Sequence, residues 1–284
     1  MPRSFRFAIC NELWGNRPIE DVFVEAKMFG YDAIEIAPFI ISKDVTEISD
    51  ARRNQIRLAA EVSKLKIVGL HWLLKDTEGM HISDPDKAVR DRTSGYLVEL
   101  VRFCHDIGGD TMVFGSPQQR SIKPDVEPDR ARTLSLHTLK QAVRVGADLG
   151  VMLCIEPLSP DQTNFLTTAE EAAAFADNLE ELAGHPVRII LDCYSMRSEQ
   201  CSRGWLIRRH APILHHVHLN DLNMQGPGMA ENGIDFTEVF AALIEIGYRG
   251  CVSVEAFDFS PGADVIATRS YQHLVDCYES VINR

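Results

Sequence analysis

Several common signatures are missing from this chain of 284 residues. Its seven cysteines are scattered singly with no Cys-x-x-Cys pair, which argues against a disulfide framework. No apolar run approaches the roughly 20 residues that a membrane span needs. Residues 1–7 lead straight into a strand pattern and lack the apolar core of a secretory signal. We therefore expect a cytoplasmic protein with no membrane partner.

The sequence also lacks an excess of positive charge. It has 29 Lys and Arg against 41 Asp and Glu, a formal net charge of -12. An acidic surface disfavours non-specific binding to nucleic acid, so we expect no nucleic-acid partner. No G-x-G-x-x-G follows the first apolar segment, which argues against a dinucleotide-binding Rossmann fold.

What the chain does contain is a short apolar segment followed by an amphipathic one, eight times over. This alternation predicts a parallel sheet covered by helices, and eight units at this length favour a closed (β/α)8 barrel, the TIM barrel. No change of composition marks a linker, so we expect a single domain over residues 1–284. The predicted strands cover residues 5–10, 32–37, 66–71, 111–115, 151–157, 187–192, 213–218 and 251–255. The predicted helices cover residues 18–29, 50–65, 85–107, 125–149, 168–183, 198–210, 236–246 and 265–283.

Each of the last four predicted strands ends in a residue of a type that binds metals. These residues are Glu156, Asp192, His218 and Glu255. In a barrel the carboxyl ends of the strands meet at one mouth, and neighbouring strands lie about 5 Å apart. Three clustered carboxylates would repel one another without a cation. We therefore predict one divalent ion per chain, with Mn²⁺ the preferred candidate and Mg²⁺ or Co²⁺ as alternatives.

Other residues with useful side chains follow the first three strands. His71 is a candidate acid/base or substrate contact, and Glu12 is a candidate ligand contact. Trp14 and Trp72 could form apolar walls against the CH face of a sugar. Glu35 could touch a ligand or instead make a structural hydrogen bond inside the barrel.

Charged residues are also expected in the loops at the mouth. Lys75, Arg120 and Arg197 fall in these loops, where most such side chains are solvated. The loops after the last two strands, residues 220–233 and 256–262, contain no Lys or Arg. A phosphate dianion usually requires a cation, so we expect an unphosphorylated substrate.

The sequence resembles the xylose isomerase-like TIM barrel superfamily, in the branch of sugar phosphate isomerases/epimerases and ketose 3-epimerases. The resemblance covers essentially the whole chain and implies a divalent-metal-dependent isomerase or epimerase. Such an enzyme acts on a small carbohydrate or keto-polyol by proton transfer through a metal-stabilised cis-enediolate, and its relatives are usually dimers or tetramers. The matching segments are residues 155–158, 163–166, 191–192, 216–218, 233–236 and 252–255.

The resemblance also assigns roles to the four metal-binding candidates. Glu156 and Glu255 would be both metal ligands and proton carriers, on opposite sides of the substrate carbon. Asp192 and His218 would be ligands only. A base on each face of the substrate carbon permits epimerisation, whereas a base on one face is sufficient for aldose–ketose isomerisation.

The chain departs from the epimerase pattern at three substrate-contacting positions. Ser195 stands where the epimerases have a His, Gln162 where they have a Glu, and Met224 where they have an Arg. Gln162 and Ser195 could still hydrogen-bond a substrate, although neither can be an ionised partner. Because of these changes, the sequence does not determine which sugar is the substrate.

Two other activities are compatible with the same barrel. The altered substrate contacts leave a metal-dependent lyase, a dehydratase or decarboxylase of a keto-sugar or keto-acid, as the alternative. An endonuclease IV-like nuclease is less favoured, because the extra histidines of its three-zinc site are missing and the net charge is -12.

Overall fold

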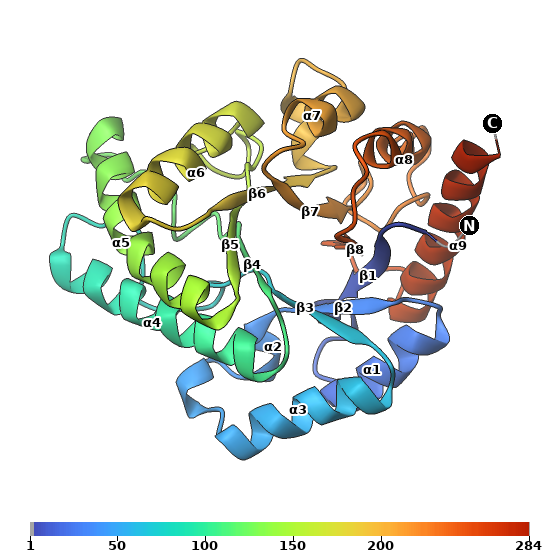
Figure 1. Cartoon of the computed structure of the whole chain (residues 1–284), viewed down its shortest axis with the longest axis horizontal. Coiled ribbons are helices and arrows are strands. Elements are labelled where there is room, and N and C mark those ends of the chain that lie inside the picture. The colour runs from blue at the N-terminus through green and yellow to red at the C-terminus, as the bar shows by residue number, and fades with distance from the viewer. Residues whose placement is uncertain (1–2, 284) are drawn as a thin grey trace.

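The computed structural model describes residues 3–283 of the chain. Eight parallel strands close into a barrel in the order β1 to β8, with β1 paired to β8. Helices surround this barrel, as Figure 1 shows. The predicted (β/α)8 barrel is therefore confirmed. The strands are β1 (Arg6–Cys10), β2 (Ala33–Ile36), β3 (Lys66–Leu70), β4 (Thr111–Phe114), β5 (Met152–Ile155), β6 (Arg188–Asp192), β7 (Leu214–Leu219) and β8 (Cys251–Val254).

The helices occupy the segments between the strands. The α-helices are α1 (Ile19–Met28), α2 (Pro38–Ile41), α3 (Asp50–Val62), α4 (Lys87–Asp106), α5 (Pro128–Leu149), α6 (Ala169–Ala183), α7 (Arg203–Arg209), α8 (Phe236–Glu245) and α9 (Ala263–Ile282). Three short 3₁₀ helices are η1 (Asn11–Trp14), η2 (Val45–Glu47) and η3 (Ser195–Ser198). None of the helices within residues 3–283 has the length and apolar character of a membrane span.

The strands form where apolar residues run without alternation. All four residues of β2, β4 and β8 are buried, because the barrel interior covers one face and the helices cover the other. The core continues outward into the apolar faces of the helices. The strand pattern was thus sufficient to place all eight strands.

Capping residues decide where the helices begin and end. Thr168 accepts a hydrogen bond from the Glu171 amide and begins α6, and Gly150 and Gly184 end α5 and α6 in the left-handed conformation. The predicted start of the helix over residues 198–210 was wrong. The Ser202 side chain caps α7 at Arg203, and residues 195–198 form η3 instead.

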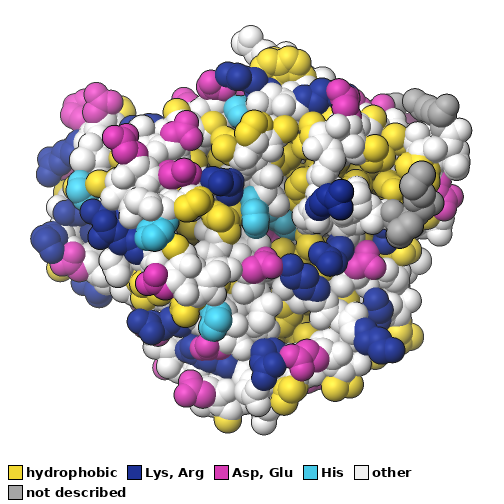
Figure 2. All heavy atoms as spheres, in the orientation of Figure 1, with side chains coloured by type: hydrophobic (Ala, Val, Ile, Leu, Met, Phe, Trp, Pro, Cys, Tyr) yellow, Lys and Arg dark blue, Asp and Glu magenta, His cyan; other side chains and the backbone are white. Residues whose placement is uncertain are grey.

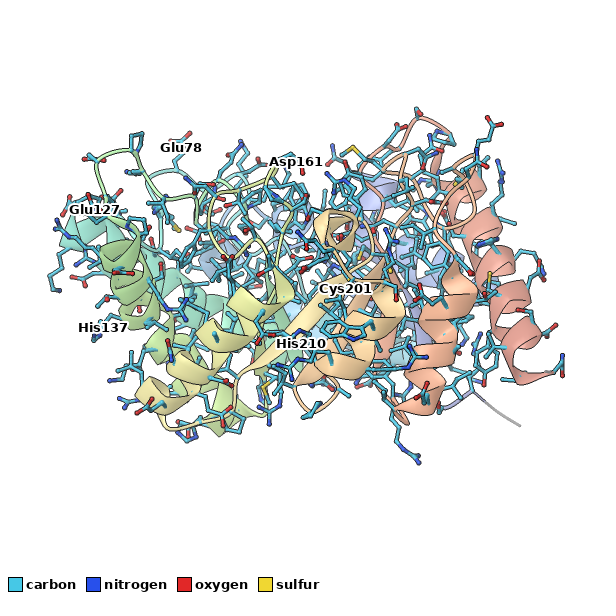
Figure 3. The ribbon with its side chains drawn as sticks, turned by 90° about the horizontal axis from the view of Figure 1, so that it is seen from above. Glu78, Glu127, His137, Asp161, Cys201 and His210 are labelled. Atoms are coloured by element: carbon cyan, nitrogen blue, oxygen red, sulfur yellow. The ribbon has the colours of Figure 1, made fainter. Side chains whose placement is uncertain are left out.

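The carboxyl ends of the strands open at one end of the barrel. Figure 3 shows Glu78 and Asp161, from the loops after β3 and β5, at that same end. Figure 2 shows another face, on which basic and acidic side chains are interspersed. Among the described residues on that face no continuous basic strip is visible.

Candidate active site

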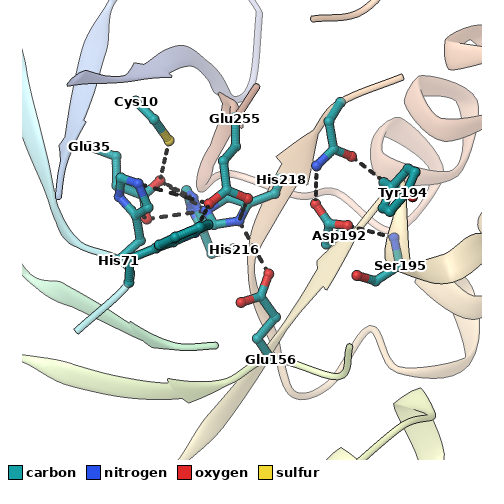
Figure 4. Close-up of polar contacts among 12 residues, drawn as sticks. Cys10, Glu35, His71, Glu156, Asp192, Tyr194, Ser195, His216, His218 and Glu255 are labelled. Carbon is teal, nitrogen blue, oxygen red and sulfur yellow. Dashed lines mark hydrogen bonds and ion pairs between the residues drawn. The ribbon is translucent and has the colours of Figure 1, made fainter. Parts of the chain in front are cut away.

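Four side chains of types that bind metals meet at the mouth of the barrel. Glu156 follows β5, Asp192 ends β6, His218 lies near the end of β7, and Glu255 follows β8. All four are buried, and one potential ligand atom from each lies within 4.8 Å of the others. The strand register produces this meeting, since Asp192 pairs directly with His218 and the Glu255 amide donates to the Leu219 carbonyl at 3.1 Å. We call these four residues the metal cluster (Figure 4).

The imidazole of His218 shows that the cluster suits a cation. Its Nδ1 lies 2.9 Å from Glu255 Oε2 and 3.4 Å from Glu156 Oε1. Yet this buried nitrogen makes no hydrogen bond of acceptable geometry with any residue in the described part of the chain. An imidazole nitrogen surrounded by carboxylate oxygens is the set of ligand atoms expected at a site for a hard divalent ion.

The carboxylates of the cluster are crowded in a buried place. Burial raises the pKa of Glu255 to about 7, and the charge of Glu156 acts in the same direction. Burial and Glu156 likewise raise the pKa of Asp192. Burial alone would lower the pKa of His218, but the charges of Glu255 and Glu35 raise it well above its ordinary value. A bound cation would stabilise the ionised carboxylates and remove this conflict.

Glu35 holds the other side of the His218 ring. This carboxylate is completely buried on β2 and lies 2.8 Å from His216 Nε2 and 3.2 Å from His218 Nε2. Burial would raise the pKa of Glu35, but the two histidines lower it well below its ordinary value. A carboxylate on Nε2 fixes the ring and directs Nδ1 to the metal cluster. The structural contact expected for Glu35 inside the barrel is present.

Asn220 and the backbone after β6 hold Asp192 in place. The Asn220 amide donates to Asp192 Oδ2 at 2.6 Å, and the Ser195 amide donates to Asp192 Oδ1 at 2.6 Å. The Asn220 side chain in turn accepts from the Tyr194 amide at 2.7 Å. Sequence reasoning missed Asn220, although its position two residues after His218 places both side chains on one side of the strand.

His71, Glu12 and Trp72 lie beside the metal cluster, as expected from their positions after β1 and β3. His71 is fully buried, with Nε2 3.0 Å from Glu12 Oε2 and 3.9 Å from Glu255 Oε1. Burial would lower the pKa of His71, but Glu12, Glu35 and Glu255 raise it to about 9. Trp72 Nε1 donates to Glu255 Oε1 at 2.8 Å, so the Trp72 indole positions this carboxylate.

Gln162 and Ser195 contact each other on the other side of the mouth. The Ser195 hydroxyl donates to Gln162 Oε1 at 3.0 Å, and the Ser159 hydroxyl donates to the same oxygen at 2.7 Å. This pair is a polar wall that could hydrogen-bond a substrate. Trp14 is buried at the end of η1, on the side of the mouth formed by the loops after β1, β2, β3 and β8.

Arg120 corrects the expectation that the mouth cations are solvated. Its side chain is completely buried and donates to the carbonyls of Glu156 at 2.6 Å and Leu166 at 3.0 Å. The backbone at the end of β5 leaves carbonyls that require donors, and the guanidinium supplies several at once. Arg120 therefore fixes the backbone that carries Glu156. Lys75 and Arg197 are partly exposed.

Gly115, directly after β4, makes room for the Glu156 carboxylate. A Cβ at Gly115 would lie 1.6 Å from Glu156 Oε2. This atom is the free end of a side chain, so Gly115→Ala should displace the carboxylate while the barrel still folds. We expect metal affinity and activity to fall about 10- to 100-fold, the usual effect of disturbing the groups around a metal. Metal titration and thermal unfolding of the variant check this.

Gly69 in β3 supplies a matched control for that variant. A Cβ there would lie 1.7 Å from the Thr111 carbonyl oxygen, a backbone atom that cannot move aside. Gly69→Ala should therefore lower the melting temperature strongly, whereas Gly115→Ala should not. Equal loss of stability in both variants would contradict the specific role of Gly115.

Comparison with known proteins agrees with this architecture. The chain matches the family described as xylose isomerase-like TIM barrel over residues 23–277. A D-psicose 3-epimerase of Agrobacterium fabrum is 29% identical over 258 residues, covering 83% of this chain and 83% of the relative. A ketose 3-epimerase of Arthrobacter globiformis is 34% identical over 188 residues, covering 65% of this chain and 62% of the relative.

A solved structure shares the fold across the whole barrel. The crystal structure of D-psicose 3-epimerase with D-tagatose from Clostridium cellulolyticum H10 superposes with a TM-score of 0.80 at 21% identity. It covers 98% of this chain and 99% of the other. The names of these relatives agree with the predicted isomerase or epimerase class and give no support to a lyase or an endonuclease IV-like nuclease.

Proposed function

The chain belongs to the xylose isomerase-like TIM barrel family, and from this we propose that it is a divalent-metal-dependent epimerase or isomerase of a small ketose-type carbohydrate. The curated relatives, named as ketose 3-epimerases, support the reaction class. The observation that carries the proposal is the metal cluster, in which two glutamates from β5 and β8 flank the His218 imidazole.

Glu156 and Glu255 are the proposed proton carriers. Each is buried, and each lies within 3.4 Å of the His218 Nδ1 atom, so both carboxylates border the same small space. One carboxylate removes the proton next to the substrate carbonyl, and the other returns a proton to the opposite face, which inverts the carbon. Burial raises the pKa of Glu255 to about 7, a value suited to proton transfer near neutral pH.

The four cluster residues would hold the metal ion. Each of the three carboxylate residues is held by a neighbouring side chain: Glu156 through its backbone by Arg120, Asp192 by Asn220 and Glu255 by Trp72. A divalent ion bound there would supply Lewis-acid chemistry to the substrate oxygens. Asp192 and His218 act as ligands without moving protons. Mn²⁺ is the ion we propose, since three carboxylates and one imidazole form a hard donor set.

The substrate we propose is unphosphorylated. The loops after β7 and β8 offer no Lys or Arg to a phosphate. The Gln162–Ser195 pair offers neutral hydrogen-bonding groups instead. His71 and Glu12 lie next to Glu255 and are the remaining polar groups in reach of a bound sugar.

Proton exchange in heavy water tests the proposed function. We expect the Mn²⁺-loaded protein to incorporate deuterium next to the carbonyl of at least one ketose in a panel of free and oxidised sugars. This measurement detects enolisation whatever the final product. Release of carbon dioxide or water from the substrate would indicate a lyase instead, and absence of exchange across the panel would contradict the proposal.

Binding of the metal should also stabilise the fold. At a free Mn²⁺ concentration 100 times the dissociation constant, a single site adds about 2.7 kcal/mol. For a domain of this size we expect the melting temperature to rise by roughly 5–10 °C, and a chelator to reverse the rise. Elemental analysis should give one metal per chain, whereas three equivalents would favour the nuclease site.

We propose that the protein is cytoplasmic and that it forms a homo-oligomer. All seven cysteines are free thiols, and six of them are buried, which suits a reducing cytoplasm. We propose a homo-oligomer, a dimer or tetramer, on the family resemblance. Light scattering of the purified protein measures the assembly directly.

A further inference from the structure

A cavity of about 540 Å³ lies beside the metal cluster at the mouth of the barrel. The loops after β1, β2, β3 and β8 line it, and five of its lining side chains are aromatic. A volume in this range holds a ligand larger than a single six-carbon sugar. We call it the aromatic pocket; its lining residues are Glu12, Leu13, Trp14, Gly15, Phe39, Ile40, Trp72, Lys75, Ala256, Phe257 and Phe259.

Trp72 connects the aromatic pocket to the metal cluster. Its indole N–H donates to Glu255 Oε1 at 2.8 Å, while its ring centre lies 6.2 Å from that of Phe39 and 5.8 Å from that of Phe257. The Trp72 backbone has a φ of 51°, which is rare for a bulky residue and is seen mainly where surrounding contacts impose it. Trp72 therefore contacts the proposed proton carrier Glu255 and also forms part of the pocket wall.

The two charged residues of the aromatic pocket already have partners. Glu12 Oε2 lies 3.0 Å from His71 Nε2. The Lys75 ammonium lies 4.5 Å from the centre of the Trp72 ring and 3.8 Å from Asp76 Oδ1. Because each charge lies beside an oppositely charged side chain, the pocket suits an uncharged group better than a phosphate or carboxylate.

Two residues that line the pocket, Trp14 and Glu12, each have a buried polar atom without a hydrogen bond of acceptable geometry in the described part of the chain, Trp14 Nε1 and Glu12 Oε2. Of these two atoms, Trp14 Nε1 is a hydrogen-bond donor. An unpaired buried donor is costly and is usually satisfied by a ligand or water. A sugar ring matches this wall, since its CH faces are apolar and its edges carry hydroxyl oxygens that accept hydrogen bonds.

The two sides of the mouth differ in polarity. The Gln162–Ser195 pair, from the loops after β5 and β6, lies on one side, and the aromatic pocket lies on the other. A substrate whose reacting end lies at the metal cluster can therefore extend in one direction over aromatic rings.

We propose that the substrate is a ketose joined by a glycosidic bond to a second, uncharged sugar ring, and that the aromatic pocket binds this second ring. The inference rests on the proposed function for the ketose half of the substrate. The second ring contributes binding energy away from the reacting carbon, and its contacts decide which ketoses the enzyme prefers.

Deuterium exchange with four sugars tests the preference. The probes are fructose, fructose 6-phosphate, isomaltulose and maltulose, the last two being fructose with a glucose ring on O6 or O4. We expect at least one disaccharide to exchange with a kcat/KM about tenfold or more above that of fructose. Phe257→Ala should reduce this ratio about tenfold, whereas Trp205→Ala, which removes an exposed aromatic residue on α7, should leave it unchanged. Exchange of fructose or fructose 6-phosphate as fast as both disaccharides would overturn the proposal.

Fluorescence separates this inference from the proposed function. Trp205→Ala leaves Trp14 and Trp72 as the two remaining tryptophans, and both line the aromatic pocket. Isomaltulose or maltulose should change their emission at lower concentrations than fructose does, and Phe257→Ala should weaken this response. Such a response without proton exchange for any ketose would contradict the proposed function but support the pocket. Exchange of fructose with no fluorescence response to either disaccharide would support the function and overturn the pocket.

Discussion

Glu156→Gln and Glu255→Gln should each reduce epimer interconversion by about 10²- to 10⁴-fold, the usual contribution of a positioned proton carrier. The physical reason is that an amide can still offer an oxygen to a cation but cannot accept the substrate proton. Both side chains are buried beside His218, so a base from solution cannot take their place. The measurement is the rate of interconversion of two epimers, with the metal content of each variant checked by elemental analysis.

The same two variants should differ in which epimer still exchanges its proton. If the carboxylates work from opposite faces, the glutamate that remains can act on one epimer only. Glu156→Gln should therefore retain deuterium exchange into one epimer, and Glu255→Gln should retain it into the other. Full exchange into both epimers by both variants would show that these glutamates are not the proton carriers.

Replacement of Glu35 should produce the second large effect. This carboxylate contacts His216 at 2.8 Å and His218 at 3.2 Å in a fully buried place. Glu35→Gln should lower metal affinity about 10- to 100-fold, because the His218 ring loses the anion that orients it. The loss of a buried partner should also cost about 3 kcal/mol of folding free energy. Metal titration and denaturant unfolding measure the two effects separately.

His216→Asn provides the matched comparison for Glu35. It removes the other partner of the carboxylate but leaves the Glu35–His218 contact in place. We expect it to lose stability while retaining most of the metal affinity. If His216→Asn lowered metal affinity as much as Glu35→Gln, the orienting role of Glu35 would be wrong.

The barrel was predictable because its strands are buried on both faces. Continuous apolar runs such as residues 151–155 have few alternatives to a central parallel strand, and eight of them in alternation with helices leave few topologies. The metal cluster was predictable for a related reason. A single carboxylate or imidazole at the end of such a run lies at the mouth wherever the barrel closes.

Contacts across the barrel interior could not be predicted in the same way. The Glu35–His216 contact joins residues 181 positions apart, on strands that are not neighbours. Nothing in the local pattern around Glu35 shows which side chain it meets. The buried role of Arg120 was hidden for a similar reason, because its partners are backbone carbonyls of residues 156 and 166. Every residue has a backbone carbonyl, so the sequence does not show which carbonyls a side chain will contact.

The division of the mouth between two halves of the barrel has a consequence for how new specificities arise. The metal cluster comes from β5 to β8, whereas most of the aromatic pocket comes from loops after β1, β2 and β3. Insertions and substitutions in the first three loops can thus accumulate while the half that carries the metal cluster is left intact. His71 and Trp72 are the constraints in the loop after β3, since both contact Glu255 across the boundary. Libraries that randomise residues 39, 40 and 75 with His71 and Trp72 held fixed should yield altered substrate ranges without loss of the proposed metal binding.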